Sequence, residues 1–215
     1  MKYKALFIVL IILLSTGCKT LQDETYDTLI TNAIESSVNL KNIYRAGYVY
    51  YLPKGMKFIA HEGTNEIFAT NEEMYYMYVD RVSYYNKMKE DYKINEEAVY
   101  SQAIFKDSKF GYIEIKNTEN DKYFIEIMYN YAKIEVIVNK DRANEAVAYA
   151  MSVLSSVSYQ DTVLANLMGE DVLKSNEVEH NIFESAETES GYLEIVEEYG
   201  QYEEEENIDP DFIRR

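Results

Sequence analysis

Cysteine, proline, glycine and histidine are all scarce in this 215-residue chain. The single cysteine, Cys18, excludes an intramolecular disulfide. Because there are only two prolines and eight glycines, neither long proline-rich linkers nor glycine-rich phosphate-binding loops are expected. One cysteine and two histidines, His61 and His180, supply too few ligands for a structural zinc site. We therefore expect no metal and no cofactor.

Basic residues are also few. The chain has 21 basic and 38 acidic residues and a formal net charge of −17, so it would repel nucleic acid. The acidity is uneven, because residues 184–211 hold twelve acidic side chains and neither lysine nor arginine. We expect a solvated acidic tail over residues 184–215. The run from Glu203 to Glu206, followed by Asp209 and Asp211, lacks a spaced calcium-binding loop, so any calcium binding there would be weak.

The common catalytic motifs are missing as well. The chain contains no HExxH, GxSxG, GxGxxG or GKS/GKT sequence. Both histidines read as surface or turn residues rather than as general bases. Two glutamate doublets, residues 72–73 and 96–97, offer the residue type that a glycosidase needs, but adjacent residues of a strand point to opposite faces.

What the chain does contain is typical of an ordinary globular protein of one domain. Apolar residues make up 47% and aromatic residues 14% of the sequence. The aromatic residues are unevenly distributed among types, with 22 tyrosines, 8 phenylalanines and no tryptophan.

The amino terminus has the layout of a secretory signal. Lys2 and Lys4 precede an unbroken apolar run over residues 5–14, which as a helix covers roughly half of the ~30 Å hydrocarbon thickness of a bilayer. The run ends in Ser15-Thr16-Gly17-Cys18, which resembles the lipobox of bacterial lipoproteins, although Ser15 stands where leucine is commonest.

That resemblance implies that a signal peptide of residues 1–17 is removed and that Cys18 carries a thioether-linked diacylglyceryl group. It also implies a protein anchored at the extracytoplasmic face of the cell membrane, since two acyl chains give a stable anchor. The alternative is an ordinary signal peptide whose mature chain keeps a free thiol.

Periodicity predicts the elements that follow. Residues 18–43 form a short tether and an amphipathic helix in which Leu29, Ile30 and Ala33 share one face, with Asp23 or Thr25 as its cap. Strands are expected near residues 47–52, 57–61, 66–70 and 74–80. Residues 81–95 have no clear period and suggest a long exposed excursion.

Residues 98–138 contain four strand-like runs separated by short turns, which predicts an antiparallel meander. Ile113 and Ile115, for example, alternate with polar residues. A helix over residues 143–154, capped by Asn139, should cover the apolar face of the meander, and a second helix should follow over residues 161–173. The predicted fold class is α+β, with one globular domain over residues 44–183.

The order of early strands, meander and a helix ending SVLSSVSY, together with the YLPKG sequence of residues 51–55, resembles PsbP and Mog1-like domains. In that family a carboxy-terminal helix lies across an antiparallel sheet. The resemblance covers residues 44–160 and implies a fold but no particular function.

Tyrosines are the one feature that suggests recognition, because each combines a flat apolar ring with a polar tip. The candidate recognition residues are Tyr48, Tyr50, Tyr51, Tyr75, Tyr76 and Tyr78. The competing interpretation is that tyrosine is simply a favoured strand residue.

The leading hypothesis is a nonenzymatic lipoprotein, attached to the membrane through Cys18, that binds an envelope protein or wall component with a tyrosine-bearing sheet. A glycan hydrolase that uses two carboxylates is the first alternative, and it requires a cleft with two carboxyl groups about 5 to 10 Å apart. A carrier of small ligands is the second, and it requires an enclosed apolar pocket.

Overall fold

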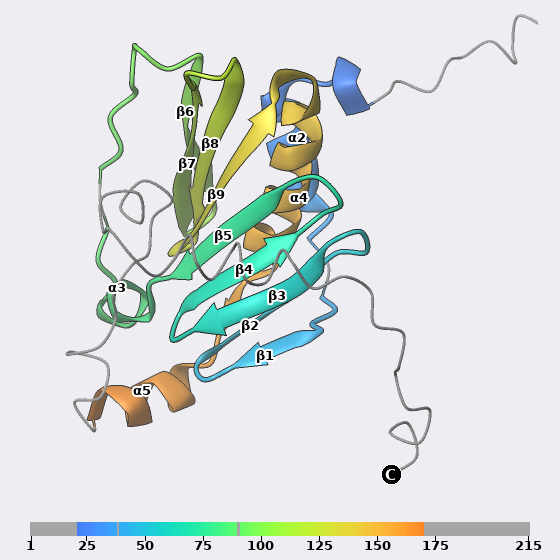
Figure 1. Ribbon diagram of the computed structural model, residues 1–215. Coiled ribbons are helices and arrows are strands. Elements are labelled where there is room, and N and C mark those ends of the chain that lie inside the picture. The colour runs from blue at the N-terminus through green and yellow to red at the C-terminus, as the bar shows by residue number, and fades with distance from the viewer. Residues whose placement is uncertain (1–20, 38, 90, 170–215) are drawn as a thin grey trace, which may run out of the picture. The chain divides into compact units, whose positions relative to one another are not determined.

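The computed structural model describes residues 21–37, 39–89 and 91–169 (Figure 1). Cys18, the predicted signal segment, His180 and the predicted acidic tail lie outside the described residues, so the predictions about them stay predictions. Within these ranges, no helix combines the length and the apolar character that a membrane span requires. The elements are η1 (Leu21–Asp23), α2 (Tyr26–Glu35), β1 (Ile43–Arg45), β2 (Tyr48–Tyr50), β3 (Lys57–Glu62), β4 (Asn65–Ala69), β5 (Met74–Val79), α3 (Arg81–Asn86), β6 (Tyr100–Lys106), β7 (Lys109–Asn117), β8 (Lys122–Tyr129), β9 (Ala132–Asn139), η2 (Lys140–Arg142), α4 (Ala143–Ser156), β10 (Ser158–Tyr159) and α5 (Asp161–Gly169).

The fold is α+β, as predicted, and is built on a seven-stranded antiparallel sheet in the order β3-β4-β5-β9-β8-β7-β6. Its second half, β6 to β9, is the predicted meander. Its first half, β3 to β5, comes from strands that were also predicted. The two halves join where β5 pairs with β9, with Met77 opposite Ile134.

Alternation along the strands gives the sheet one inner face, which α4 covers with α2 beside it (Figure 1). Ile113, Ile127 and Ile134 form one cross-strand row on this face, and all three are fully buried. Each such side chain contributes about 1.5–3 kcal/mol through burial. Val147 and Leu154 of α4 are buried in the same core, so the predicted packing of the helix on the meander is confirmed.

The two predicted helix caps have different outcomes. Thr25 does cap α2, because its hydroxyl accepts a hydrogen bond from the backbone N–H of Thr28. The prediction that Asn139 caps the helix over residues 143–154 is wrong. Asn139 precedes η2 and makes no capping hydrogen bond, because this extra 3₁₀ turn separates it from the first turn of α4.

A three-stranded sheet, in the order β1-β2-β10, packs beside the large one. Its strands β1 and β10 were not predicted, since runs of two or three residues carry little periodicity. The first part of residues 81–95, which were predicted to form a long exposed segment, is the helix α3. Tyr84 of α3 stacks on Tyr159 with ring centroids 3.7 Å apart and donates a hydrogen bond to Asp161 of α5.

Candidate binding site

The six candidate tyrosines do not form one surface. Tyr48 and Tyr50 on β2 and Tyr75 on β5 have exposed fractions of 1%, 0% and 1%. The prediction that these three lie on a recognition surface is therefore wrong, because their rings face the core between the two sheets and α4. The other three, Tyr51, Tyr76 and Tyr78, are half-buried.

Two of the buried tyrosines, Tyr48 and Tyr50, instead contact a buried carboxyl group. Glu66 on β4 is 1% exposed. It accepts hydrogen bonds from the hydroxyls of Tyr48, at 2.7 Å, and Tyr50, and it lies 3.0 Å from the guanidinium of Arg45. Burial, together with the charge of Glu66, raises the pKa of both tyrosines far above the ordinary value. The network joins the small sheet to the large one, and it offers no access to a ligand.

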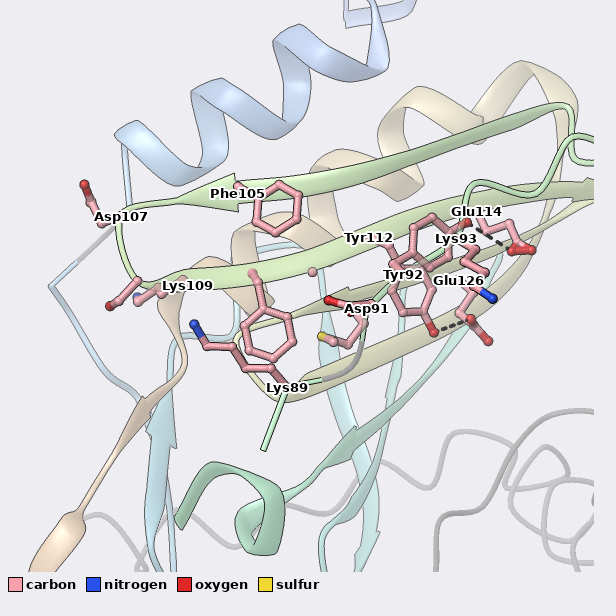
Figure 2. Close-up of a pocket in the computed structure, with 14 residues that line it drawn as sticks. Lys89, Asp91, Tyr92, Lys93, Phe105, Asp107, Lys109, Tyr112, Glu114 and Glu126 are labelled. Carbon is pink, nitrogen blue, oxygen red and sulfur yellow. Dashed lines mark hydrogen bonds between the residues drawn. The ribbon is translucent and has the colours of Figure 1, made fainter. Parts of the chain in front are cut away.

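A hollow of about 700 Å³ lies on the outer face of the large sheet, where β6, β7 and β8 adjoin the loop that follows α3 (Figure 2). This volume is within the roughly 300–1,000 Å³ that is typical of small-molecule sites. Its floor is formed by residues that alternate with the core residues of each strand, such as Phe110 and Tyr112 of β7 and Met128 of β8. We call it the outer hollow.

One end of the outer hollow is built from tyrosines and carboxylates. Tyr92 in the loop lies parallel to Tyr112, with an interplanar angle of 2° and ring centroids 4.3 Å apart. Tyr112 donates a 2.6 Å hydrogen bond to Glu126, and Tyr92 donates a 3.3 Å hydrogen bond to Glu114. The two glutamates stand directly opposite each other on β7 and β8. The stack therefore holds both the loop and the carboxylates in place.

Glu114 is held in its ionised form. Burial by itself raises its pKa, but hydrogen bonds from Lys116, Asn95 and Tyr92 and the charge of Lys116 outweigh this effect, and the pKa falls below the ordinary value. Lys116 lies 2.7 Å from one Glu114 oxygen, and the amide of Asn95 donates to the same oxygen at 2.7 Å. Glu126 is 3.7 Å from the ammonium of Lys133.

The other end of the outer hollow is aromatic and cationic. Phe105 on β6 stands directly opposite Phe110 on β7, and its exposed fraction is 75%. The ammonium of Lys89 lies 5.6 Å from the centre of the Phe110 ring. Lys106 and Lys109 stand directly opposite each other across the hairpin turn. In Figure 2 Lys89, Lys109 and Phe105 lie together at this end, away from Glu114.

A second hollow of about 230 Å³ shares Lys89, Phe110, Tyr112 and Met128 with the first, so the two are continuous. It reaches Tyr131, which with Asn130 forms the tight turn between β8 and β9. Both turn residues have positive φ, 53° and 63°, as a type I′ hairpin turn requires. The ring of Tyr131 makes an edge-to-face contact with the ring of Phe110, with ring centroids 5.1 Å apart. This contact helps to hold Tyr131 at a positive φ, which is unfavourable for a bulky residue.

The remaining predicted groups do not gather into a site. His61 lies exposed on β3, where its ring is 6.0 Å from that of Phe58. Glu73 is buried, 2.6 Å from Nε of Arg142, while Glu72 pairs with the same guanidinium from the surface. Among the described residues, no group of three or more His, Cys, Asp or Glu side chains could hold a metal ion.

Glu114 is poorly suited to act as a general acid. A general acid needs a pKa raised toward the working pH, whereas the environment of Glu114 lowers its pKa. The alternation along β7 already predicted that Tyr112 and Glu114 lie on the face of the strand turned away from the core. This part of the site could therefore be predicted from the sequence. Tyr92, Lys89 and Phe105 were missed, because the loop that carries the first two has no period.

Comparisons of this chain with protein-family models, with curated proteins and with solved structures found no match. The outer hollow must therefore be interpreted from its own chemistry.

Proposed function

We propose that this protein is a lipoprotein of the bacterial cell envelope, anchored through Cys18 at the extracytoplasmic face of the cell membrane. It acts as a nonenzymatic module that binds an envelope protein or wall component in the outer hollow. The basis for the anchor is the sequence of residues 1–18.

The observation that carries the binding role is the state of the side chains around the outer hollow. Phe105 is 75% exposed although it belongs to a strand of the main sheet. Lys93 and Lys109 line the hollow without an ion pair to any residue that the structure describes. An exposed large ring and unpaired ammonium groups do not stabilise the fold, whereas both features contribute directly to binding a ligand.

A test of the anchor is the substitution Cys18→Ala. We expect the variant to leave the membrane fraction, and we expect mass spectrometry of the wild type to find a diacylglyceryl group on the first residue of the mature chain. An unmodified Cys18, or a variant that stays with the membrane, would contradict the proposal.

The binding role is tested separately with a photo-crosslinking amino acid, p-benzoylphenylalanine, placed at position 105. Illumination of intact cells should yield a defined crosslinked product. The matched control places the same amino acid at Tyr44, which is 67% exposed on β1 and does not line the hollow. Equal products at both positions, or none at position 105, would argue against the outer hollow as the site.

A second candidate is a carboxylate-dependent hydrolase of wall glycans, and the placement of Glu114 opposite Glu126 in one hollow favours it. If the protein digests purified wall material and Glu126→Gln abolishes that digestion, the hydrolase replaces the binding module. The lowered pKa of Glu114 is the reason why we place it second.

A further inference from the structure

The strand β6 forms one edge of the large sheet. It pairs with β7 alone, and no strand within the described ranges lies on its other side. Lys106 pairs with Lys109 across the hairpin turn, so the even-numbered residues of β6 direct their backbone N–H and C=O groups toward β7. The backbone groups of Ser101, Ala103 and Phe105 therefore point away from the sheet.

The opposite edge of the sheet, β3, is blocked against pairing with a further strand. Its register shifts between Phe58 and Ala60, and charged residues, Lys57 and Glu62, stand at both of its ends. Natural sheets use such irregularities and charges because an unblocked edge pairs with other chains. Over its seven residues β6 keeps a regular register, and its only charged residue is Lys106 at one end. The edge of β6 is thus open to a further strand.

Hollows lie on both sides of this open edge. The outer hollow reaches Phe105, whose ring is 75% exposed. On the other face a hollow of about 290 Å³, which we call the inner hollow, lies between β6 and α2 and is lined in part by Ile30, Ile34 and Ile104. Figure 2 shows α2, drawn in blue, beside β6. The lining of the inner hollow includes the consecutive residues 102–106, so this hollow extends along the backbone of β6.

The two hollows match the side-chain pattern of an added strand. Successive side chains of an extended chain point to opposite faces of a sheet. A strand beside β6 would therefore direct its side chains alternately to the outer face and into the inner hollow. Ala103 stands opposite Tyr112, which lines the outer hollow. Because the side chain of Ala103 is small, an outward side chain of the added strand has room to reach over β6 beside Phe105.

An extended polypeptide backbone is the chemistry that this edge recognises. Its N–H and C=O groups recur about every 6.8 Å on each side, which is also the spacing of the outward groups of β6. The outer hollow does not select a ligand by charge, because four carboxylates and three ammonium groups line it. The isoleucines of the inner hollow favour apolar side chains at alternate positions of the bound segment.

We propose that β6 binds an extended segment of an envelope protein, which joins the seven-stranded sheet as an additional edge strand and places apolar side chains in the inner hollow. The remaining side chains of the segment pack on Phe105 at the border of the outer hollow. This inference rests on the proposed function, and it names the class of partner and the mode of binding. A second copy of this chain is the competing occupant.

The test begins with a phage library of random dodecapeptides, selected on the purified full-length protein in detergent. We expect selection to enrich peptides with apolar residues at alternate positions. The probe is a synthetic copy of the most enriched peptide. Its matched control has the same side chains but carries N-methyl groups on the backbone amides, so it cannot donate backbone hydrogen bonds. Fluorescence anisotropy should find that the control binds at least about tenfold more weakly.

Amide hydrogen exchange, followed residue by residue with nuclear magnetic resonance, locates the site on the protein. The probe should slow exchange of the amides of Ser101, Ala103 and Phe105 at least about tenfold, because these amides gain an acceptor. The amide of His61 is the control. It points outward from β3, next to the pair of Glu62 with Asn65 at the hairpin turn, and its exchange should not change.

Two proline variants test the edge itself. Ala103→Pro removes an outward N–H without breaking a hydrogen bond to β7, and it should weaken binding about two- to tenfold, the effect of losing one hydrogen bond. The matched control, His61→Pro, removes an outward N–H from β3 and should leave the affinity unchanged. Phe105→Ala should also weaken binding. Circular dichroism melting curves check that every variant folds, and the exchange measurement needs no variant.

The remaining outcomes overturn the inference. Equal binding of the probe and its N-methylated control, or equal affinity of Ala103→Pro and the wild type, would show that the backbone of β6 is not the site. Protection of residues 101–105 that grows with protein concentration, without any peptide, would make a second copy the occupant. If no peptide is enriched while the crosslink at position 105 persists in cells, the mode of binding is wrong and the proposed function stands. If both fail, the proposed function fails as well.

Discussion

Removing the carboxylate of Glu66 should strongly destabilise this protein. The side chain of Glu66 is fully buried, and it accepts hydrogen bonds from Tyr48, Tyr50 and the partly exposed Arg45. Glu66→Ala removes the acceptor of two hydroxyls and of Nη2 of Arg45, and it leaves the positive charge of Arg45 without its carboxylate. Removing one partner of a buried ion pair costs about 3–5 kcal/mol. We expect a loss of that size, against a total of roughly 5–15 kcal/mol for a typical domain.

Three comparisons separate the parts of this network. Tyr50→Phe removes one hydrogen bond to a charged group and should cost about 1.5–3 kcal/mol. The double variant Glu66→Leu with Arg45→Met removes both charges at once, and it should be more stable than Glu66→Ala, since no unpaired charge remains. Thr28→Ala is a control on the exposed side of α2, and it should cost well under about 1 kcal/mol.

The assay is urea unfolding followed by far-ultraviolet circular dichroism, because the chain has no tryptophan to report by fluorescence. The midpoint should fall without a change in slope. The reasoning would be refuted if Glu66→Ala cost less than about 1 kcal/mol, the size of an exposed ion pair. It would also be refuted if the double variant were no more stable than Glu66→Ala, because the loss of stability in Glu66→Ala would then not come from the unpaired charge of Arg45.

Three further predictions concern other parts of the fold. Burial raises the pKa of Tyr75 and Tyr159 above the ordinary 10.0, so the folded state favours their neutral forms. The contribution of these tyrosines to the free energy of unfolding is complete below pH 10 and is lost as the pH rises beyond it. Urea midpoints at a series of alkaline pH values, together with the tyrosinate absorbance, will measure this loss. The pKa of Glu114 is lowered, so its contribution to stability disappears as pH falls below the ordinary 4.5; Lys116→Met should reduce this acid-dependent part, and acid titrations that coincide for variant and wild type would contradict it. Gly111→Ala should prevent proper pairing of β7 with β8, since the added methyl would overlap the backbone carbonyl of Met128, whereas Gly63→Ala meets no atom and should cost only about 1–2 kcal/mol for its positive φ of 58°; equal melting temperatures for the two variants would refute this.

Most of the elements could be predicted from the sequence, because alternation and helical spacing report which side of each element is buried. The strands of the meander and the helix α4 are the clearest cases. The pairing of β5 with β9 could not be predicted, since alternation identifies a buried face but not the strand beside it. The prediction about the tyrosines failed for a related reason. Tyr50 and Tyr78 look alike in the sequence, yet a buried acceptor, Glu66, allows the first to lie in the core.

The outer hollow was only partly predictable. Tyr112 and Glu114 lie on the polar side of a regular strand, and their orientation follows from Ile113 between them. The wall of the hollow depends on a loop that crosses back over the sheet and on the stacking of Tyr92 on Tyr112. Such a contact between distant segments leaves no periodic signal, so only the structure could place it.

The order of strands in the large sheet sets when the sheet can be completed. β9 lies between β5 and β8, although it is the last of the seven strands to leave the ribosome. Until residues 132–139 arrive, the chain holds two separate sets of three strands with open edges and no helix α4 to cover them. Pairing with β9 must then unite both sets at once, so a nascent chain stalled before residue 132 has no route to this fold.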